Sequence, residues 1–246
     1  MVQVAPFAHP DTQMREERWD TEADHHTYLD GYGNRCERFL IPEGASRLTY
    51  TARLTLGDPE DAAGADAREV APSELPDACL GFLMPSRFCL PDELGAEAWN
   101  RFGDLEPGWA RVQAVVDFVH ELVEFTPGGS NPWTTAADVF RSRQGVCRDY
   151  AHLAISLCRA LNIPSRYVFG YISDVGVSAP VEPMDFAAWF EAYLDDGWNT
   201  FDPRNNSRRT GRVIVGKGRD AADVALITSF GSLALTDFSV RAERVA

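Results

Sequence analysis

Apolar residues recur three and four positions apart over residues 108–125, "GWARVQAVVDFVHELVEF", and this spacing predicts an amphipathic helix. A similar apolar stripe predicts a second helix over residues 147–161, which Asn and Pro residues then end. A short helix is predicted between them, with Thr134 or Thr135 as its N-cap and Gly145 as its end.

Segments that alternate in polarity and are rich in β-branched and aromatic residues predict strands. One group lies in residues 27–56, where Gly, Asn and Pro separate the segments. Three successive strands are predicted after the second long helix, in "SRYVFGYI", "FAAWFEAYL" and "GWNTFDP". One helix packed against an antiparallel sheet is the simplest arrangement for this order, so we predict an α+β fold.

These patterns divide the chain into three parts. Residues 1–58 form an N-terminal β region, and residues 77–246 hold the α+β core. Residues 59–76 are rich in Ala, Asp, Glu and Pro and have no periodicity, which predicts an exposed acidic linker or loop.

Composition narrows the classes of function. The 246-residue chain has 37 acidic and 23 basic residues and a formal charge of -14, which argues against a nucleic-acid partner. No apolar run is long enough to span a bilayer, and the N-terminus does not resemble a signal peptide, so we expect a cytoplasmic protein without a membrane partner. Its five cysteines are widely spaced, which predicts neither a disulfide framework nor a metal site, and no cofactor is expected.

The most informative cysteine is Cys147, at the predicted start of a helix. A helix N-terminus lowers the pKa of a thiol and offers backbone N–H groups to an oxyanion, so this is a suitable position for a nucleophile. The alternative is that Cys147 is a small buried apolar residue. We expect the other four to be structural: Cys36, Cys79, Cys89 and Cys158.

A cysteine nucleophile needs a base, and that base needs a group that orients it. On adjacent predicted strands, Ala187 and Asp202 are expected to face one another across the turn at residues 195–197. Asp202 ends its strand, where a carboxylate can point into a site. The alternative is that Asp202 only initiates a turn, because Asp followed by Pro is a common turn signal.

The stretch "GVCRDYAHLAISLCRALNIPSRYVFGY", followed by "DFAAWFEAYLDDGWNTFDP", resembles the core of bacterial proteins in the transglutaminase-like, or papain-like, superfamily. The resemblance implies a Cys-His-Asp triad in which Cys147 is the nucleophile and Asp202 orients the histidine. The histidine of the family belongs at position 187, where this sequence has Ala187. The resemblance also implies that Asp185, Trp189 and Trp133 contact the substrate.

No other histidine is expected to replace the missing one. His152 lies about 140 degrees round the helix from Cys147, so it points elsewhere. His120 is expected to be structural or solvated, and His9, His25 and His26 belong to the β region.

The favoured explanation for Ala187 is an engineered knockout of a cysteine-dependent acyl-transfer or amide-hydrolysing enzyme, because the rest of the motif is intact. The alternatives are a natural pseudoenzyme or binding protein, and an enzyme that uses Cys147 without histidine, for example to form amides from acyl thioesters. In each case the expected ligand is a peptide, an amide or an acyl thioester. As an enzyme, the chain is expected to be inactive or much impaired.

Overall fold

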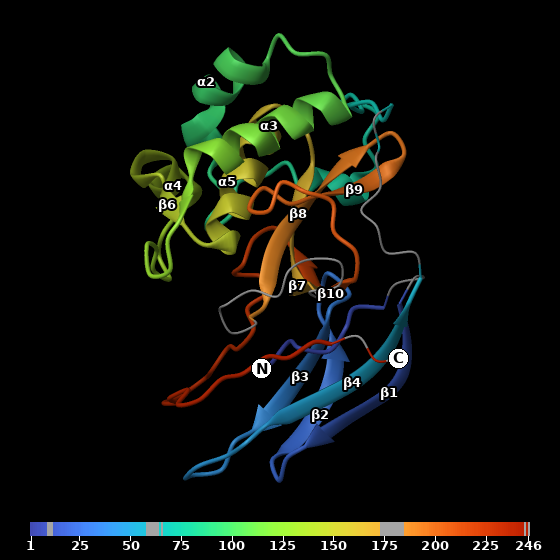
Figure 1. The fold of residues 1–246 in the computed structure, drawn as a ribbon, viewed down its shortest axis with the longest axis vertical. Coiled ribbons are helices and arrows are strands. Elements are labelled where there is room, and N and C mark those ends of the chain that lie inside the picture. The colour runs from blue at the N-terminus through green and yellow to red at the C-terminus, as the bar shows by residue number, and fades with distance from the viewer. Residues whose placement is uncertain (9–11, 58–63, 65, 173–184, 244, 246) are drawn as a thin grey trace.

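The computed structural model describes residues 1–8, 12–57, 64, 66–172, 185–243 and 245. The N-terminal region forms two antiparallel two-stranded sheets. One pairs β1 (Thr12–Asp20) with β4 (Thr49–Leu56), and the other pairs β2 (Asp24–Leu29) with β3 (Arg35–Leu40). These strands, blue in Figure 1, lie apart from the helices. The β character predicted for residues 27–56 is confirmed, and β1 adds a strand that the sequence pattern did not predict.

The core is an antiparallel four-stranded sheet in the order β10-β7-β8-β9, with helix α5 (Cys147–Ala160) packed against it. Its strands are β7 (Ser165–Ile172), β8 (Ala187–Leu194), β9 (Gly197–Phe201) and β10 (Arg212–Gly218). The predicted α+β arrangement and its three successive strands are confirmed (Figure 1). Strand β10 is additional, and two glycines within it weaken its strand pattern.

Four further helices complete the core, of which α3 (Trp109–Leu122) is the predicted amphipathic helix. The others are α1 (Asp77–Leu80), α2 (Pro91–Phe102) and α4 (Ala136–Ser142). Thr135 caps α4, since its hydroxyl accepts a hydrogen bond from the Asp138 N–H and the Asp138 carboxylate accepts one from the Thr135 N–H.

Helix α4 ends at Ser142, three residues before the predicted stop at Gly145. Arg143 takes a left-handed conformation with φ of 58°, and Gly145 instead lies in the short strand β6 (Gln144–Gly145). This strand pairs in parallel with β5 (Glu124–Phe125), directly after α3. The pairing holds the residues before Cys147 against the end of α3.

Side chains of β8 alternate between two environments. Ala188, Phe190 and the later even-numbered residues belong to the apolar core that surrounds α5, whereas Trp189 is buried on the other face. Gly170 of β7 makes room for the indole, because a Cβ atom there would lie 3.1 Å from the Trp189 ring and would overlap the carbonyl oxygen of Val213.

A buried charge cluster lies on the same face as Trp189. The Glu191 carboxylate accepts hydrogen bonds from the Arg166 Nε at 2.5 Å and from the Lys217 Nζ at 3.3 Å. Burial lowers the pKa of Lys217, and the neighbouring Glu191 carboxylate acts in the opposite direction. One carboxylate thus pairs with two cations from adjacent strands.

The segment predicted as an exposed acidic linker or loop, residues 59–76, has no helix or strand where it is described, and most of its described residues are exposed. Residues 58–63 and 65 lie outside the described residues. Further on, Ala67 and Leu75 are buried, and the Arg68 N–H donates to the Asp195 carboxylate at 2.8 Å. Glu69 also forms an ion pair with Arg111 of α3, with 3.1 Å between Oε2 and Nη1. These residues attach the segment to the core, because Ala67 and Leu75 are buried and Glu69 pairs with Arg111 of α3.

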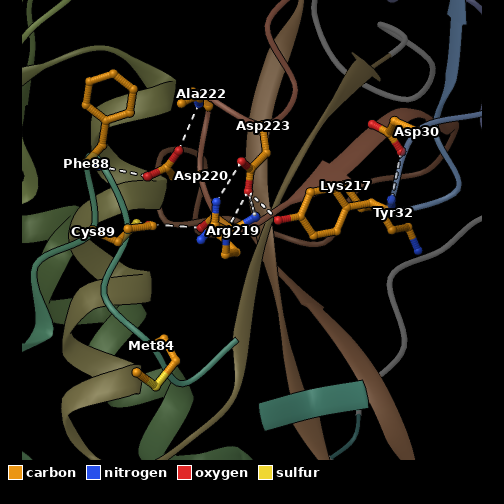
Figure 2. A network of polar contacts seen from close by, with 12 residues as sticks. Asp30, Tyr32, Met84, Phe88, Cys89, Lys217, Arg219, Asp220, Ala222 and Asp223 are labelled. Atoms are coloured by element: carbon orange, nitrogen blue, oxygen red, sulfur yellow. Dashed lines mark hydrogen bonds and ion pairs between the residues drawn. The ribbon is translucent and has the colours of Figure 1, made fainter. Parts of the chain in front are cut away.

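A polar network joins the N-terminal region to the core at the end of β10 (Figure 2). The Tyr32 hydroxyl donates to the Asp223 carboxylate at 2.8 Å, and Arg219 donates to the same carboxylate from its Nε at 2.9 Å. The Asp220 carboxylate accepts the N–H groups of Phe88 and Ala222, both at 2.8 Å. The chain after β10 therefore fastens both parts of the protein together.

Candidate active site

Cys147 is the first residue of α5 and is half-buried. The buried Asp149 carboxylate caps the helix, since its Oδ2 accepts the Val146 N–H at 2.9 Å. Its Oδ1 accepts from Nε and Nη2 of Arg148 at 3.1 and 3.0 Å. A Cβ atom at Gly145 would lie only 2.8 Å from the Cβ of Asp149, so the residue before the cap has to be small. The local sequence "GVCRD" thus fixes the thiol at the helix N-terminus.

Opposing influences act on the thiol of Cys147. Burial is the largest and raises its pKa, and the Asp202 carboxylate raises it further. The backbone N–H groups of Ala188 and Arg148 and the guanidinium of Arg204 lower the pKa, because they stabilise the thiolate. The sulfur therefore lies at the start of β8, beside the residue that follows Ala187, and within electrostatic reach of Asp202.

Ala187 is the first residue of β8, and it pairs with Gly170 of β7. The pairing of β8 with β9 ends at Phe190 opposite Phe201. Continued by one pair, this register places Trp189 opposite Asp202. Ala187 is then the diagonal neighbour of Asp202 on the same face. The sequence had suggested that the two residues lie directly opposite one another, and this register does not place them so. Side chains at diagonal positions remain within reach when one of them is long.

The carboxylate of Asp202 is buried and accepts three hydrogen bonds. Its Oδ1 accepts the Asn205 N–H at 3.0 Å, and its Oδ2 accepts from the Asn205 Nδ2 at 2.8 Å and the Arg212 Nη2 at 2.9 Å. The Arg212 guanidinium carbon also lies 4.9 Å from the centroid of the Trp189 ring. The predicted turn is present too, because the Asn206 N–H donates to the Asp202 carbonyl at 2.8 Å. A guanidinium and an amide thus stabilise the carboxylate that the family uses to orient a histidine.

Among the described residues, His152, His25 and His26 lie elsewhere, as predicted. His152 is only 1% exposed, and its Nε2 accepts the Ala221 N–H at 3.1 Å. Burial, above all, lowers its pKa to about 3, so the ring is neutral near pH 7 and occupied by a structural hydrogen bond. His25 and His26 lie on β2, and His9 lies outside the described residues.

His120 has a contact that the sequence did not predict. It is exposed near the end of α3, and its Nδ1 lies 3.1 Å from the carbonyl oxygen of Pro203. The contact ties α3 to the segment that carries Asp202.

The residues expected to contact substrate have different environments. Trp133 is 72% exposed, and its backbone N–H donates to the side-chain oxygen of Asn131. The backbone carbonyl of Asn131 accepts a hydrogen bond from Arg148 at 3.0 Å. Trp133 therefore lies on a loop beside the start of α5. Trp189 is fully buried, so it shapes the interior of the site and offers no free surface. Asp185 is exposed and accepts the N–H of Phe186 at 2.7 Å, and no contact among the described residues joins it to Cys147.

Three residues of the site gave no signal in the sequence: Arg204, Asn205 and Arg212. They follow the predicted strand in a polar stretch, "RNNSRRTGR", that is typical of a solvated loop. Only the return of the chain through β10 brings Arg212 back to Asp202. Periodicity and spacing do not reveal such a contact.

The described part of the chain has neither a group of metal-binding side chains nor a helix suited to a membrane. No group of three or more His, Cys, Asp and Glu side chains there could hold a metal ion. No helix there has both the length and the apolar character needed to cross a membrane.

Comparisons with known proteins give a consistent result. The family model described as the transglutaminase-like superfamily matches residues 98–203, which include positions 147, 187 and 202. The chain is similar to the crystal structure of a proposed cysteine protease from Cytophaga hutchinsonii, with 32% identity and a TM-score of 0.84. That match covers 94% of this chain and 79% of the other.

Two curated mycobacterial proteins, both described as uncharacterized, are also similar. A protein of Mycobacterium leprae is 34% identical over 137 residues, a match that covers 54% of this chain and 48% of the relative. A protein of Mycobacterium tuberculosis is 27% identical over 230 residues, which covers 82% of this chain and 70% of the relative. The match to the first thus spans about half of that relative's length.

Proposed function

Because the chain belongs to the transglutaminase-like superfamily, we propose that it is a cysteine-dependent acyl-transfer or amide-hydrolysing scaffold that has lost its histidine base at Ala187. The observation that carries this proposal is the position of Cys147 at the N-terminus of α5, against the start of β8 and within electrostatic reach of Asp202. The nucleophile and the orienting carboxylate of a triad are both retained there.

The proposed reaction passes through an acyl-thioester on Cys147. The thiol of Cys147 loses its proton to solvent, the sulfur attacks a carbonyl carbon, and the N–H groups at the start of α5 stabilise the oxyanion. The leaving group then departs, and water or an amine accepts the acyl group. An amide leaving group must be protonated as it departs, which a histidine would do and Ala187 cannot. Activated esters and thioesters need no such proton, so they are the donors that this chain should still process slowly.

A natural pseudoenzyme is the second candidate, and the surroundings of Asp202 favour it. Three hydrogen bonds from Asn205 and Arg212 already satisfy the carboxylate in the absence of an imidazole. A site from which histidine had only been removed would instead be expected to leave one carboxylate oxygen without a donor, whereas both oxygens of Asp202 accept a hydrogen bond. In this case the cleft binds a peptide or acyl segment without turnover. The cytoplasmic location expected from the sequence is part of both proposals.

The test is the rate of Cys147 alkylation by iodoacetamide as a function of pH, in the parent protein and in Ala187→His. The other four cysteines are buried, and Cys147→Ser supplies the blank. Even an unperturbed thiol is only a few per cent thiolate at pH 7, and burial reduces this fraction. A restored base should therefore accelerate the reaction at pH 7 on the order of 30-fold. Hydrolysis of an activated ester by the same variant should increase in parallel.

Coincident pH profiles for the two proteins would contradict the proposal, because the cleft would then not support a cysteine and histidine pair. A third variant, His120→Ala, checks the histidine that approaches Pro203. Its alkylation rate should equal that of the parent. A slower rate would mean that another base already serves Cys147, and the scaffold would not lack one.

A further inference from the structure

Arg204 lies at the N-terminus of α5, as its contact with an aromatic ring shows. Its guanidinium carbon is 4.1 Å from the ring centroid of Phe125. Phe125 pairs with Gly145, and the Thr126 N–H donates to the Gly145 carbonyl at 3.0 Å. Gly145 is only two residues before Cys147. The stacked guanidinium is therefore held beside the nucleophile.

The chain turns directly after β9, since the Asn206 N–H donates to the Asp202 carbonyl at 2.8 Å, and Arg204 lies within this turn. The Arg204 guanidinium lowers the pKa of Cys147, which agrees with a position near the thiol.

Arg204 differs from the other two arginines of the site. Arg148 binds the Asp149 carboxylate and Arg212 binds the Asp202 carboxylate. Arg204 is half-buried and has no hydrogen bond or ion pair within the part of the chain that the structure describes, although the exposed Glu124 lies beside Phe125. A guanidinium that lies over an aromatic ring still has N–H groups that can donate, and its planar fork matches a carboxylate. The chain as a whole has a net charge of -14, so a cation without an ion pair beside the thiol favours an anionic ligand there.

We propose that Arg204 is a specificity-determining residue that binds the carboxylate of an anionic acyl donor while the donor's reacting carbonyl lies at Cys147. The inference rests on the proposed function, since it assigns a substrate class to the same thiol. It predicts that the site distinguishes donors by the charge next to the reacting carbon. Neutral donors of equal size should gain nothing from Arg204.

Two small alkylating reagents test this directly. Iodoacetate and iodoacetamide both form a bond between the sulfur and carbon, release iodide and leave the thiol proton to solvent, but only iodoacetate carries a carboxylate. The measurement is the ratio of their rates at Cys147, mapped by peptide mass spectrometry. In Arg204→Gln this ratio should fall about fivefold, since a partly exposed ion pair contributes on the order of 1 kcal/mol. Added salt should reduce the parent ratio as well.

Two matched variants complete the experiment. Arg208→Gln makes the same charge change at an exposed position four residues further on, and it should leave the ratio unchanged. Arg204→Lys keeps the cation and should retain part of the preference. An unchanged ratio in Arg204→Gln would overturn the proposal, as would an equal fall in Arg208→Gln. An equal loss of both rates would also overturn it, because Arg204 would then act on the thiol alone. If neither reagent labels Cys147 in any variant, the proposed function itself fails.

Discussion

The buried His152 should make the stability of the protein depend on pH. Burial lowers its pKa to about 3 in the folded chain, against an ordinary value of 6.5. Arg148 and Arg159 act in the same direction and the Asp149 carboxylate acts against it. The unfolded chain therefore binds a proton at mildly acidic pH that the folded chain does not bind. The contribution is present in full above pH 6.5 and is lost progressively as the pH falls toward 3.

The size of the effect follows from the difference in pKa. Each unit corresponds to 1.36 kcal/mol, so between pH 6.5 and pH 5 the free energy of unfolding should fall by about 2 kcal/mol through this one group. The change His152→Gln removes the titration while leaving an oxygen that can accept the Ala221 N–H. It also costs stability at every pH, because the ring stacks on Phe88 with 5.1 Å between the centroids. The dependence on pH is therefore the quantity to compare.

Urea unfolding at pH 7 and pH 5 measures this dependence in both proteins. The parent should lose about 2 kcal/mol more than His152→Gln between the two conditions. The control His26→Gln removes an exposed histidine on β2 and should retain the full loss of the parent. An equal pH dependence in the parent and His152→Gln would refute the reasoning. It would mean that the folded protein accepts a proton on His152, which the hydrogen bond from Ala221 excludes.

Two further predictions concern packing and charge around the sheet. Gly170→Ala should destabilise the protein by about 3 kcal/mol in urea unfolding, because its Cβ would overlap the carbonyl oxygen of Val213. The control Gly95→Ala, where a Cβ meets nothing within 4 Å, should be neutral or stabilising. Equal effects of the two substitutions would contradict the reasoning. Glu191→Ala leaves two largely buried cations without their carboxylate and should cost about 3 kcal/mol or more, whereas Glu97→Ala, at a more exposed pair, should cost under about 1 kcal/mol. A loss below about 1 kcal/mol for Glu191→Ala would show that water reaches the cluster.

Much of the core could be predicted from local sequence. The apolar spacing of α3 and α5 and the alternation in β7, β8 and β9 are strong, because each element buries one continuous face. The prediction of a cap at Thr134 or Thr135 was also correct, since a hydroxyl before a helix and an acid three residues on satisfy free N–H groups locally. The same reasoning placed Cys147 at a helix start, from residues that lie within one turn of it.

Elements with a weaker local pattern needed the tertiary structure. Helix α2 buries Leu94, Ala98 and Phe102, a narrow stripe interrupted by polar residues, and two glycines dilute the pattern of β10. Arg143 ends α4 in a left-handed conformation that a sequence rule assigns to glycine. Packing against the core outweighed the local pattern in α2 and β10, whereas backbone hydrogen bonds to Val139 and Glu124 hold the exposed Arg143.

The sequence by itself indicated the candidate nucleophile Cys147, the candidate carboxylate Asp202 and the position of the missing histidine, because short motifs around them resemble those of the family. Only the tertiary structure decided what surrounds them. Arg204 reaches the site by stacking on Phe125, and Arg212 reaches Asp202 from another strand. Such contacts join residues that are distant in the chain, and the free energy that forms them comes from packing of the whole sheet. For this reason the charge beside the thiol, and with it the class of ligand, could be inferred only from the folded chain.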